Sequence, residues 1–305
     1  MGLEISSEGV AIAQGPGASS SRAELNLCEF LSFDPATDDP KRDSQLQRDM
    51  LEQRIDALDL KNAPCHVVMP VGSYQLLLVE APKVEPKELG EAIRWRIKDL
   101  INYPLEEAAV DAFLLPKDSS SSGASMAYAV VVKKEYIRSL VSFVEQARLE
   151  LKAIDIGEMC LQNVLSAGAD KEALSRSTAL VKFRQGSGSL HVYKAGNLYL
   201  SRQFKLDYGA GLLDDLPQEA LVLELQRSLD YYERQMRQVP PRTIYFCGDN
   251  ISEDKITDGI QSSLSADIKV LPVSESFELS ETIEAHILSL CLPAVGATLR
   301  PVGEI

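Results

Sequence analysis

The first fourteen residues, MGLEISSEGVAIAQ (Met1–Gln14), set the interpretation of the whole chain. Two short apolar runs, one around Leu3 and Ile5 and one over Val10–Ala13, flank the polar turn Ser6–Gly9. This pattern predicts two antiparallel strands joined as a hairpin. A turn rich in small residues also exposes backbone N–H groups that can hold a phosphate, although an ordinary hairpin turn is the commoner outcome of such a composition.

The second half of the chain repeats this pattern. The segment STALVKFRQGSGSLHVYKAGNLYLSRQF (residues 177–204) predicts three strands, with the small-residue turn Gln185–Ser189 between the first two. In each half, three strands precede a helix and a buried strand. We therefore predict two α/β lobes of the same topology, with the turns Ser6–Gly9 and Gln185–Ser189 facing each other across a cleft.

A smaller unit interrupts the first lobe. Strand and helix patterns follow one another as β-α-β-β-α between Val71 and Glu150, with the helix Glu85–Tyr103 stopped by Pro104. This order predicts an inserted α+β subdomain. The predicted division of the chain is a first lobe over 1–70, the inserted subdomain over 71–150, a return to the first lobe and hinge over 151–175, a second lobe over 176–280, and a C-terminal helix returning to the first lobe over 281–305.

The composition and charge narrow the classes of protein to which this chain could belong. The 305 residues are 45% apolar and 25% charged, as is usual for a soluble globular protein, and the formal net charge is -14. Nucleic-acid binders normally present a basic face, so binding to nucleic acid or directly to anionic lipid is disfavoured. The chain begins with a strand instead of a signal peptide, and apolar runs such as Tyr128–Val132 are too short to span a bilayer. We expect a cytosolic protein with no segment inserted in a membrane.

The cysteines and histidines predict neither a disulfide framework nor a metal site. The cysteines are odd in number, widely spaced and set in apolar contexts, so we expect reduced, buried thiols: Cys28, Cys65, Cys160, Cys247 and Cys291. The three histidines, His66, His191 and His286, lack the spacing of metal ligands. The sequence also contains no Gly-x-Ser-x-Gly turn and no Walker phosphate loop.

Two further stretches have alternative interpretations. CGDN (Cys247–Asn250) follows a buried strand, where ligands gather in open α/β sheets, but Asp249 or Asn250 could simply cap the next helix. ELQRSLDYYERQ places Glu224, Arg227 and Tyr231 on one helical face, which is consistent with a pocket wall or with pairing within the helix.

Several stretches, in this order, resemble the PilM-like cytoplasmic proteins of type IV pilus assembly: MGLEISSEGVAIA, IKDLINYPLEE, LKAIDIGEMCLQNVL, ELQRSLDYYERQ, TIYFCGDN and VGATLRP. The resemblance covers nearly the whole chain. It is strongest to the MshI branch, which serves mannose-sensitive haemagglutinin pili, and extends to the cytoplasmic domain of the type II secretion protein GspL. It implies an actin-like ATPase fold, with duplicated ribonuclease H-like lobes and an inserted subdomain of the type found in FtsA.

The resemblance also implies an ATP site between the lobes, at positions where this sequence departs from the family. Glu4 stands where the first phosphate loop has Asp, Ser6 stands where it has Gly, and no Lys follows. Glu8 adds negative charge, and the small helical subdomain of the second lobe is largely missing. We therefore expect Mg-ATP to bind weakly or not at all. The implied nucleotide-binding residues are Glu4, Ser6, Ser7, Glu8, Gly9, Gln185, Gly186, Ser187 and Gly188 at the phosphates, and Glu224, Arg227, Gly248 and Asp249 at the ribose and base.

Catalysis is not assigned to any residue. Asp155 and Glu158 are candidates for positioning a water molecule, and the alternative is that they form a hinge and a helix N-cap. The function expected from the resemblance is a scaffold of the pilus assembly platform, at the inner face of the cytoplasmic membrane. The competing functions are a working ATPase that gates pilus or type II secretion assembly and, from another class, a sugar kinase of the same superfamily.

The resemblance implies a protein partner, the short cytoplasmic tail of a bitopic inner-membrane protein of the PilN type, beside other platform proteins. In the predicted helix Glu85–Tyr103 the only tryptophan, Trp95, points away from the apolar face, as an interface anchor would. The alternative is that Trp95 covers a neighbouring loop. We expect the tail to enter a groove that the insertion shares with the first lobe, with Trp95, Tyr103, Pro104 and Leu105 as candidate contacts.

Overall fold

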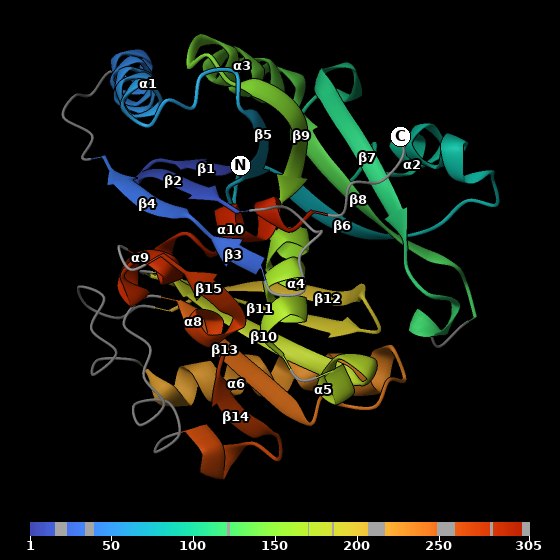
Figure 1. The fold of residues 1–305 in the computed structure, drawn as a ribbon. Coiled ribbons are helices and arrows are strands. Elements are labelled where there is room, and N and C mark those ends of the chain that lie inside the picture. Colours follow the sequence, from blue (N-terminus) through green and yellow to red (C-terminus); the bar gives the residue numbers. More distant parts are fainter. Residues whose placement is uncertain are drawn as a thin grey trace.

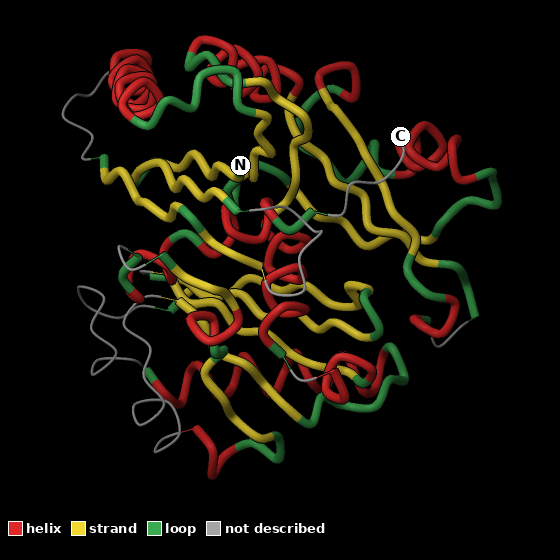
Figure 2. The backbone as a smooth tube through the Cα atoms, in the orientation of Figure 1, coloured by secondary structure: helices red, strands yellow, loops and turns green. Residues whose placement is uncertain are grey.

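Two α/β lobes and a smaller inserted unit make up the computed structural model, which describes residues 1–15, 23–33, 40–120, 123–169, 171–184, 186–206, 217–248, 260–280 and 283–300. The lobes lie one above the other in Figure 1, with the insertion beside the first lobe. Sheets form the centre of each lobe and helices cover them (Figure 2). Gln185, Asp249 and the segment 207–216, where the helical subdomain is predicted to be largely missing, lie outside the described residues.

The first lobe is built on a five-stranded sheet in the order β4-β2-β1-β5-β9. β1 and β2 form the predicted hairpin, β4 extends it antiparallel, and β5 and β9 continue parallel to β1. Helices α1 and α3 pack on one face, and α4 and α10 on the other (Figure 1). The bounds are β1 (Gly2–Ser6), β2 (Gly9–Gln14), β4 (Leu27–Ser32), α1 (Pro40–Ala57), β5 (Pro64–Met69), α3 (Lys134–Gln146), β9 (Glu150–Ile156), α4 (Gly157–Gly168) and α10 (Leu292–Thr298).

The second lobe has the same topology. Its sheet order is β12-β11-β10-β13-β14, so each lobe places its third, second, first, fourth and fifth strands side by side in that order. β10, β11 and β12 are antiparallel, and β13 and β14 run parallel to β10. The bounds are α5 (Lys171–Ser175), β10 (Ser177–Arg184), β11 (Ser187–Lys194), β12 (Asn197–Lys205), α6 (Gln218–Asp230), continued by a π-helix (Tyr231–Gln235), β13 (Thr243–Gly248) and β14 (Asp267–Val270).

The insertion is a three-stranded antiparallel sheet covered by one helix. Ile93 and Ile97 pack against Ala129 and Val131 of β8 to form its own apolar core. Helix α2 is shorter than the predicted Glu85–Tyr103, since a 3-10 turn precedes it and turns replace regular helix over 97–103. The bounds are β6 (Gln75–Glu80), α2 (Leu89–Arg96), β7 (Ala108–Leu114) and β8 (Met126–Lys133), in the sheet order β6-β8-β7, with 3-10 turns at Pro86–Glu88, Leu105–Glu107 and Lys117–Ser119.

Helix α3 belongs to the core of the first lobe. Its side chains Leu140, Phe143 and Val144 pack with Leu3 and Val67 of the first sheet. The range 71–150 predicted for the insertion therefore contains one helix that serves as the crossover between β5 and β9. The opposite face of the insertion's sheet carries α2, so α2 and α3 lie on different sides of it.

The C-terminal part of the chain ties the two lobes together. β3 (Ala23–Leu25) pairs in parallel with β15 (Phe277–Leu279), which follows the last strand of the second lobe. After α9 (Ala285–Leu290), helix α10 lies against β1, β2 and β5 and along α4. The remaining described elements are α8 (Val273–Ser276) and a 3-10 turn at Gln261–Ser263.

Candidate functional site

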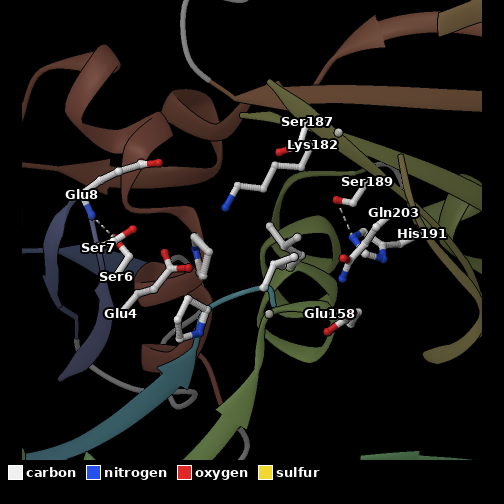
Figure 3. A pocket seen from close by; sticks show the side chains of 16 residues that line it. Glu4, Ser6, Ser7, Glu8, Glu158, Lys182, Ser187, Ser189, His191 and Gln203 are labelled. Atoms are coloured by element: carbon white, nitrogen blue, oxygen red, sulfur yellow. Dashed lines mark hydrogen bonds between the residues drawn. The ribbon is translucent and has the colours of Figure 1, made fainter. Parts of the chain in front are cut away.

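A cavity of about 300 Å³ lies between the lobes, where the two hairpins approach each other (Figure 3). The first lobe contributes one wall, the second lobe the facing wall, and the start of α4 the floor. The polar and small residues that line it are Glu4, Ser6, Ser7, Glu8, Gly157, Glu158, Lys182, Ser187, Gly188, Ser189, His191 and Gln203. The structure thus brings together most of the residues predicted at the phosphates.

Three of the residues predicted at the ribose and base, Glu224, Arg227 and Gly248, do not line this cavity. Glu224 and Arg227 pair with each other along α6, at 2.9 Å. Gly248 lines a separate cavity of about 200 Å³ together with Leu271 and Leu288. In the structure these two charged residues pair within the helix.

Lys182 is a cavity residue that the sequence analysis missed. It lies on β10 directly opposite Ser189 of β11, which lies opposite Gln203 of β12. These three side chains share the sheet face toward the cavity, and the amino group of Lys182 points into it (Figure 3). One signal was present, since a single charge interrupts the otherwise apolar run from Ala179 to Phe183.

Glu4 faces Lys182 from the first lobe. Its side chain is only 7% exposed and its carboxylate points into the cavity (Figure 3). Within the described ranges, neither Glu4 nor Lys182 forms an ion pair with another side chain. A buried carboxylate without a partner is costly. The cavity therefore suits a ligand that offers a cation to Glu4 and an anion to Lys182.

A network of buried hydrogen bonds joins the cavity wall to the insertion. The hydroxyl of Tyr74, just before β6, donates to the Glu158 carboxylate, and Ser201 donates to it at 3.2 Å. His191 contacts Ser201 through Nδ1 at 3.1 Å and Ser189 through Nε2 at 2.9 Å. Since Ser201 gives its proton to Glu158, Nδ1–H donates to Ser201 and Nε2 accepts from Ser189.

These hydrogen bonds define the roles of Glu158 and His191 in the cavity wall. Glu158 is 1% exposed and both of its carboxylate oxygens accept hydrogen bonds. Burial lowers the pKa of His191 to about 4, which keeps the ring neutral at pH 7. The second candidate for positioning water, Asp155, pairs with Arg300. The arrangement fits a structural link between the lobes and the insertion better than a catalytic role.

A second cavity of about 260 Å³ lies on the other side of the first hairpin, between α1 and α3. We call it the α1–α3 groove. Its lining is Ile5, Ser6, Ser7, Ser44, Gln47, Pro70, Ser73, Tyr136, Ser139, Leu140 and Phe143. Gln47 donates to the carbonyl of Ser6 at 2.8 Å, which holds the hairpin turn against α1.

The four residues predicted to contact a partner lie elsewhere on the insertion. Trp95 is 71% exposed on α2, as its position in the helix predicts. Tyr103 is half-buried beneath the Lys133 amino group, and Leu105 is buried. None of them lines the α1–α3 groove, because α2 covers the opposite face of the insertion's sheet.

The five cysteines are buried free thiols, as predicted. Burial raises the pKa of Cys65 to about 11 and that of Cys247 to about 12, so these thiols are poor nucleophiles at neutral pH. Of the helices in the described part of the chain, none is both long enough and apolar enough to cross a membrane.

The comparisons with known proteins identify the fold. The sequence matches no family model and no curated protein. In structure, the chain is similar to the PilM-PilN type IV pilus biogenesis complex, with a TM-score of 0.75 and 16% identity over 99% of this chain and 98% of that chain.

Two further solved structures share this arrangement. A Bacteroides thetaiotaomicron protein with an actin-like ATPase fold has a TM-score of 0.54 and 9% identity, over 90% of this chain and 93% of that one. The cytoplasmic domain of EpsL, an inner-membrane component of the Vibrio cholerae type II secretion system, has a TM-score of 0.50 and 11% identity, over 94% and 96%. As the sequence predicted, this chain has the actin-like ATPase fold.

Proposed function

We propose that this protein is a cytoplasmic scaffold of a type IV pilus assembly platform that docks the cytoplasmic tail of a bitopic inner-membrane protein of the PilN type. The similarity to the PilM-PilN complex over nearly the full length of both chains supports the proposal. Because stretches of this sequence resemble the MshI branch, we propose that the platform assembles pili of the mannose-sensitive haemagglutinin type. In this proposal the bitopic partner holds the protein at the inner membrane, where it also contacts other platform proteins.

The observation that carries the proposal is the α1–α3 groove. Leu140, Phe143 and Ile5 give it apolar lining, and the exposed serines Ser44 of α1 and Ser139 of α3 lie at its edge. A short extended tail can place apolar side chains on this lining and pair its backbone with the serine hydroxyls. The net charge of -14 also suits a tail that carries the positive charge typical of cytoplasmic flanks.

The groove predicts where the tail binds. Ser139 of α3 and Ser44 of α1 are exposed on its rim, so replacing either with arginine should fill the groove without disturbing the core. We expect Ser139→Arg to weaken binding of a fluorescent PilN-type tail peptide by roughly a hundredfold, because the peptide loses its apolar contacts. Fluorescence anisotropy measures the affinity, and thermal unfolding confirms the fold of each variant.

The matched control is Ser262→Arg, an exposed serine of the second lobe. Trp95→Ala tests the candidate contact on α2 in the same assay. Equal affinity of Ser139→Arg and Ser262→Arg would place the tail outside the groove, and loss of binding in Trp95→Ala alone would place it on the α2 side of the insertion.

The alternative function, an ATP-binding protein or ATPase, has one specific observation in its favour. Glu4 and Lys182 face each other across the interlobe cavity, and together they suit the metal and the phosphates of Mg-ATP. Glu8 adds a second carboxylate at the same wall, and Glu224, Arg227 and Gly248, predicted at the ribose and base, do not line the cavity. The phosphate end of the nucleotide fits and the nucleoside end does not.

We expect the resulting affinity for Mg-ATP to be weak, with a Kd of roughly 0.1 mM or higher. Lys182→Gln should weaken this binding by a further factor of about ten, since it removes the cation at the phosphates. Lys98→Gln, at an exposed lysine of the insertion, is the control with the same change in charge. Calorimetric titration measures all three proteins, and a low-micromolar Kd, or no effect of Lys182→Gln on measurable binding, would contradict the prediction.

A further inference from the structure

A cationic cavity of about 180 Å³ lies at the end of the second lobe where β10, β13 and β14 begin, far along the strands from the interlobe cavity. Arg176, Arg242 and Lys269 line it, together with the acidic residues Glu172 and Asp267. The chain as a whole carries a net charge of -14. This excess of positive charge is therefore a local feature and not part of a generally basic surface.

Two of the three cations are available to a ligand. Arg176 forms an ion pair with Glu172 at 2.9 Å, beside α5. For Arg242 and Lys269, no carboxylate of the described ranges lies at ion-pair distance. Both side chains are exposed, so their charged groups can turn toward an anion in the cavity at little cost.

The hydroxyl of Tyr245 adds an independent observation. Tyr245 is only 5% exposed and its side chain lines the cavity. Its hydroxyl has no hydrogen-bond partner in the protein, within the residues that the structure describes. This hydroxyl is not among the buried atoms of the described residues, so it is open to the cavity and can donate to a ligand there. Since Tyr245 lies opposite Lys269 in the sheet, the hydroxyl and the lysine reach the same space from neighbouring strands.

We propose that this cavity binds a tetrahedral oxyanion of the phosphate type. Donors come from three positions: Arg242 just before β13, Tyr245 on β13 and Lys269 on β14, beside Arg176, which pairs with Glu172. A planar carboxylate offers two oxygens, whereas a phosphate offers four and can accept from all of these directions. The anion is either free phosphate or the phosphoryl group of a small molecule. The inference is independent of the proposed function, because the cavity shares no lining residue with the α1–α3 groove.

The test is calorimetric titration of the whole chain with inorganic phosphate at neutral pH and low ionic strength. We expect saturable binding with a Kd on the order of 1 mM. Lys269→Gln and Tyr245→Phe should each weaken it by about tenfold, since each removes one hydrogen bond to a charged group. Lys98→Gln, with the same change in net charge at a distant site, should leave it unchanged.

The result separates the sources of the anion. Binding of both phosphate and O-phosphoserine identifies the phosphoryl group of a larger molecule, and binding of phosphate alone identifies the free ion. Absence of saturable binding to the wild-type protein overturns the proposal, as does equal weakening by Lys98→Gln or tighter binding of acetate. Lys269 is exposed, so its variant keeps the test decisive if Tyr245→Phe fails to fold.

Discussion

Replacing Gly296 with alanine should lower the free energy of unfolding by about 3 kcal/mol or more. A Cβ at this position would fall on the backbone carbonyl of Cys160 in α4, closer than any van der Waals contact. No rotation of a side chain relieves a clash with backbone, so α10 and α4 would have to separate. The carbonyl of Gly296 also accepts a hydrogen bond from Asn163 at 3.0 Å, which fixes the same approach.

Urea unfolding measures this loss as a shift of the midpoint at constant slope. The matched control is Gly90→Ala in α2, where a Cβ would meet only the carbonyl of Val110, at 3.8 Å. Alanine there should stabilise the protein by up to about 1 kcal/mol, through its higher helix propensity. If Gly296→Ala proved as stable as the wild type, α4 and α10 would not pack as closely as the structure has them.

Acid should cost the protein about 3 kcal/mol of stability through His191 alone. Burial lowers the pKa of this imidazole to about 4, with smaller and opposing contributions from Glu158 and Lys182, whereas the unfolded chain has a pKa near 6.5. Between these values the unfolded state binds a proton that the folded state excludes. The contribution of His191 is therefore complete above pH 6.5 and is lost as the pH falls to about 4.

The measurement is urea unfolding at several pH values across that window. His191→Gln keeps hydrogen-bonding groups beside Ser189 and Ser201 but cannot titrate, so its stability should fall less steeply with pH. His286→Gln, at an exposed histidine, is the control and should follow the wild type. Carboxylates titrate in all three proteins, so the test is the difference between their curves of unfolding free energy against pH. Parallel curves for His191→Gln and wild type would refute the prediction.

The architecture was predictable because it rests on local patterns that occur twice. The apolar runs on either side of Ser6–Gly9 and of Gln185–Ser189 specify two hairpins, and equal topology then places both at the same cavity. The exposure of Trp95 also follows from its place in a helical repeat. Each of these inferences needs only residues that are near one another in the sequence.

The missed features depend on contacts between distant residues. Lys182 enters the cavity because β10 pairs with β11 in one register, and a one-residue shift would turn the lysine to the other face of the sheet. Helix α3 follows the insertion in sequence, but its apolar face fits the first lobe. The groove between α1 and α3 could not be predicted for the same reason, since its two walls lie about ninety residues apart.

The place of α10 has a consequence for synthesis on the ribosome. Strand β1 packs against α10, which begins 290 residues later in the chain, at Leu292 against Gly2. At roughly 5–20 residues per second, β1 waits for about 15 to 60 seconds before the helix that covers it exists. The first lobe therefore cannot complete its fold in the order in which it is translated, and a nascent chain shortened before Leu292 exposes the apolar underside of that sheet to the cell's chaperones and proteases.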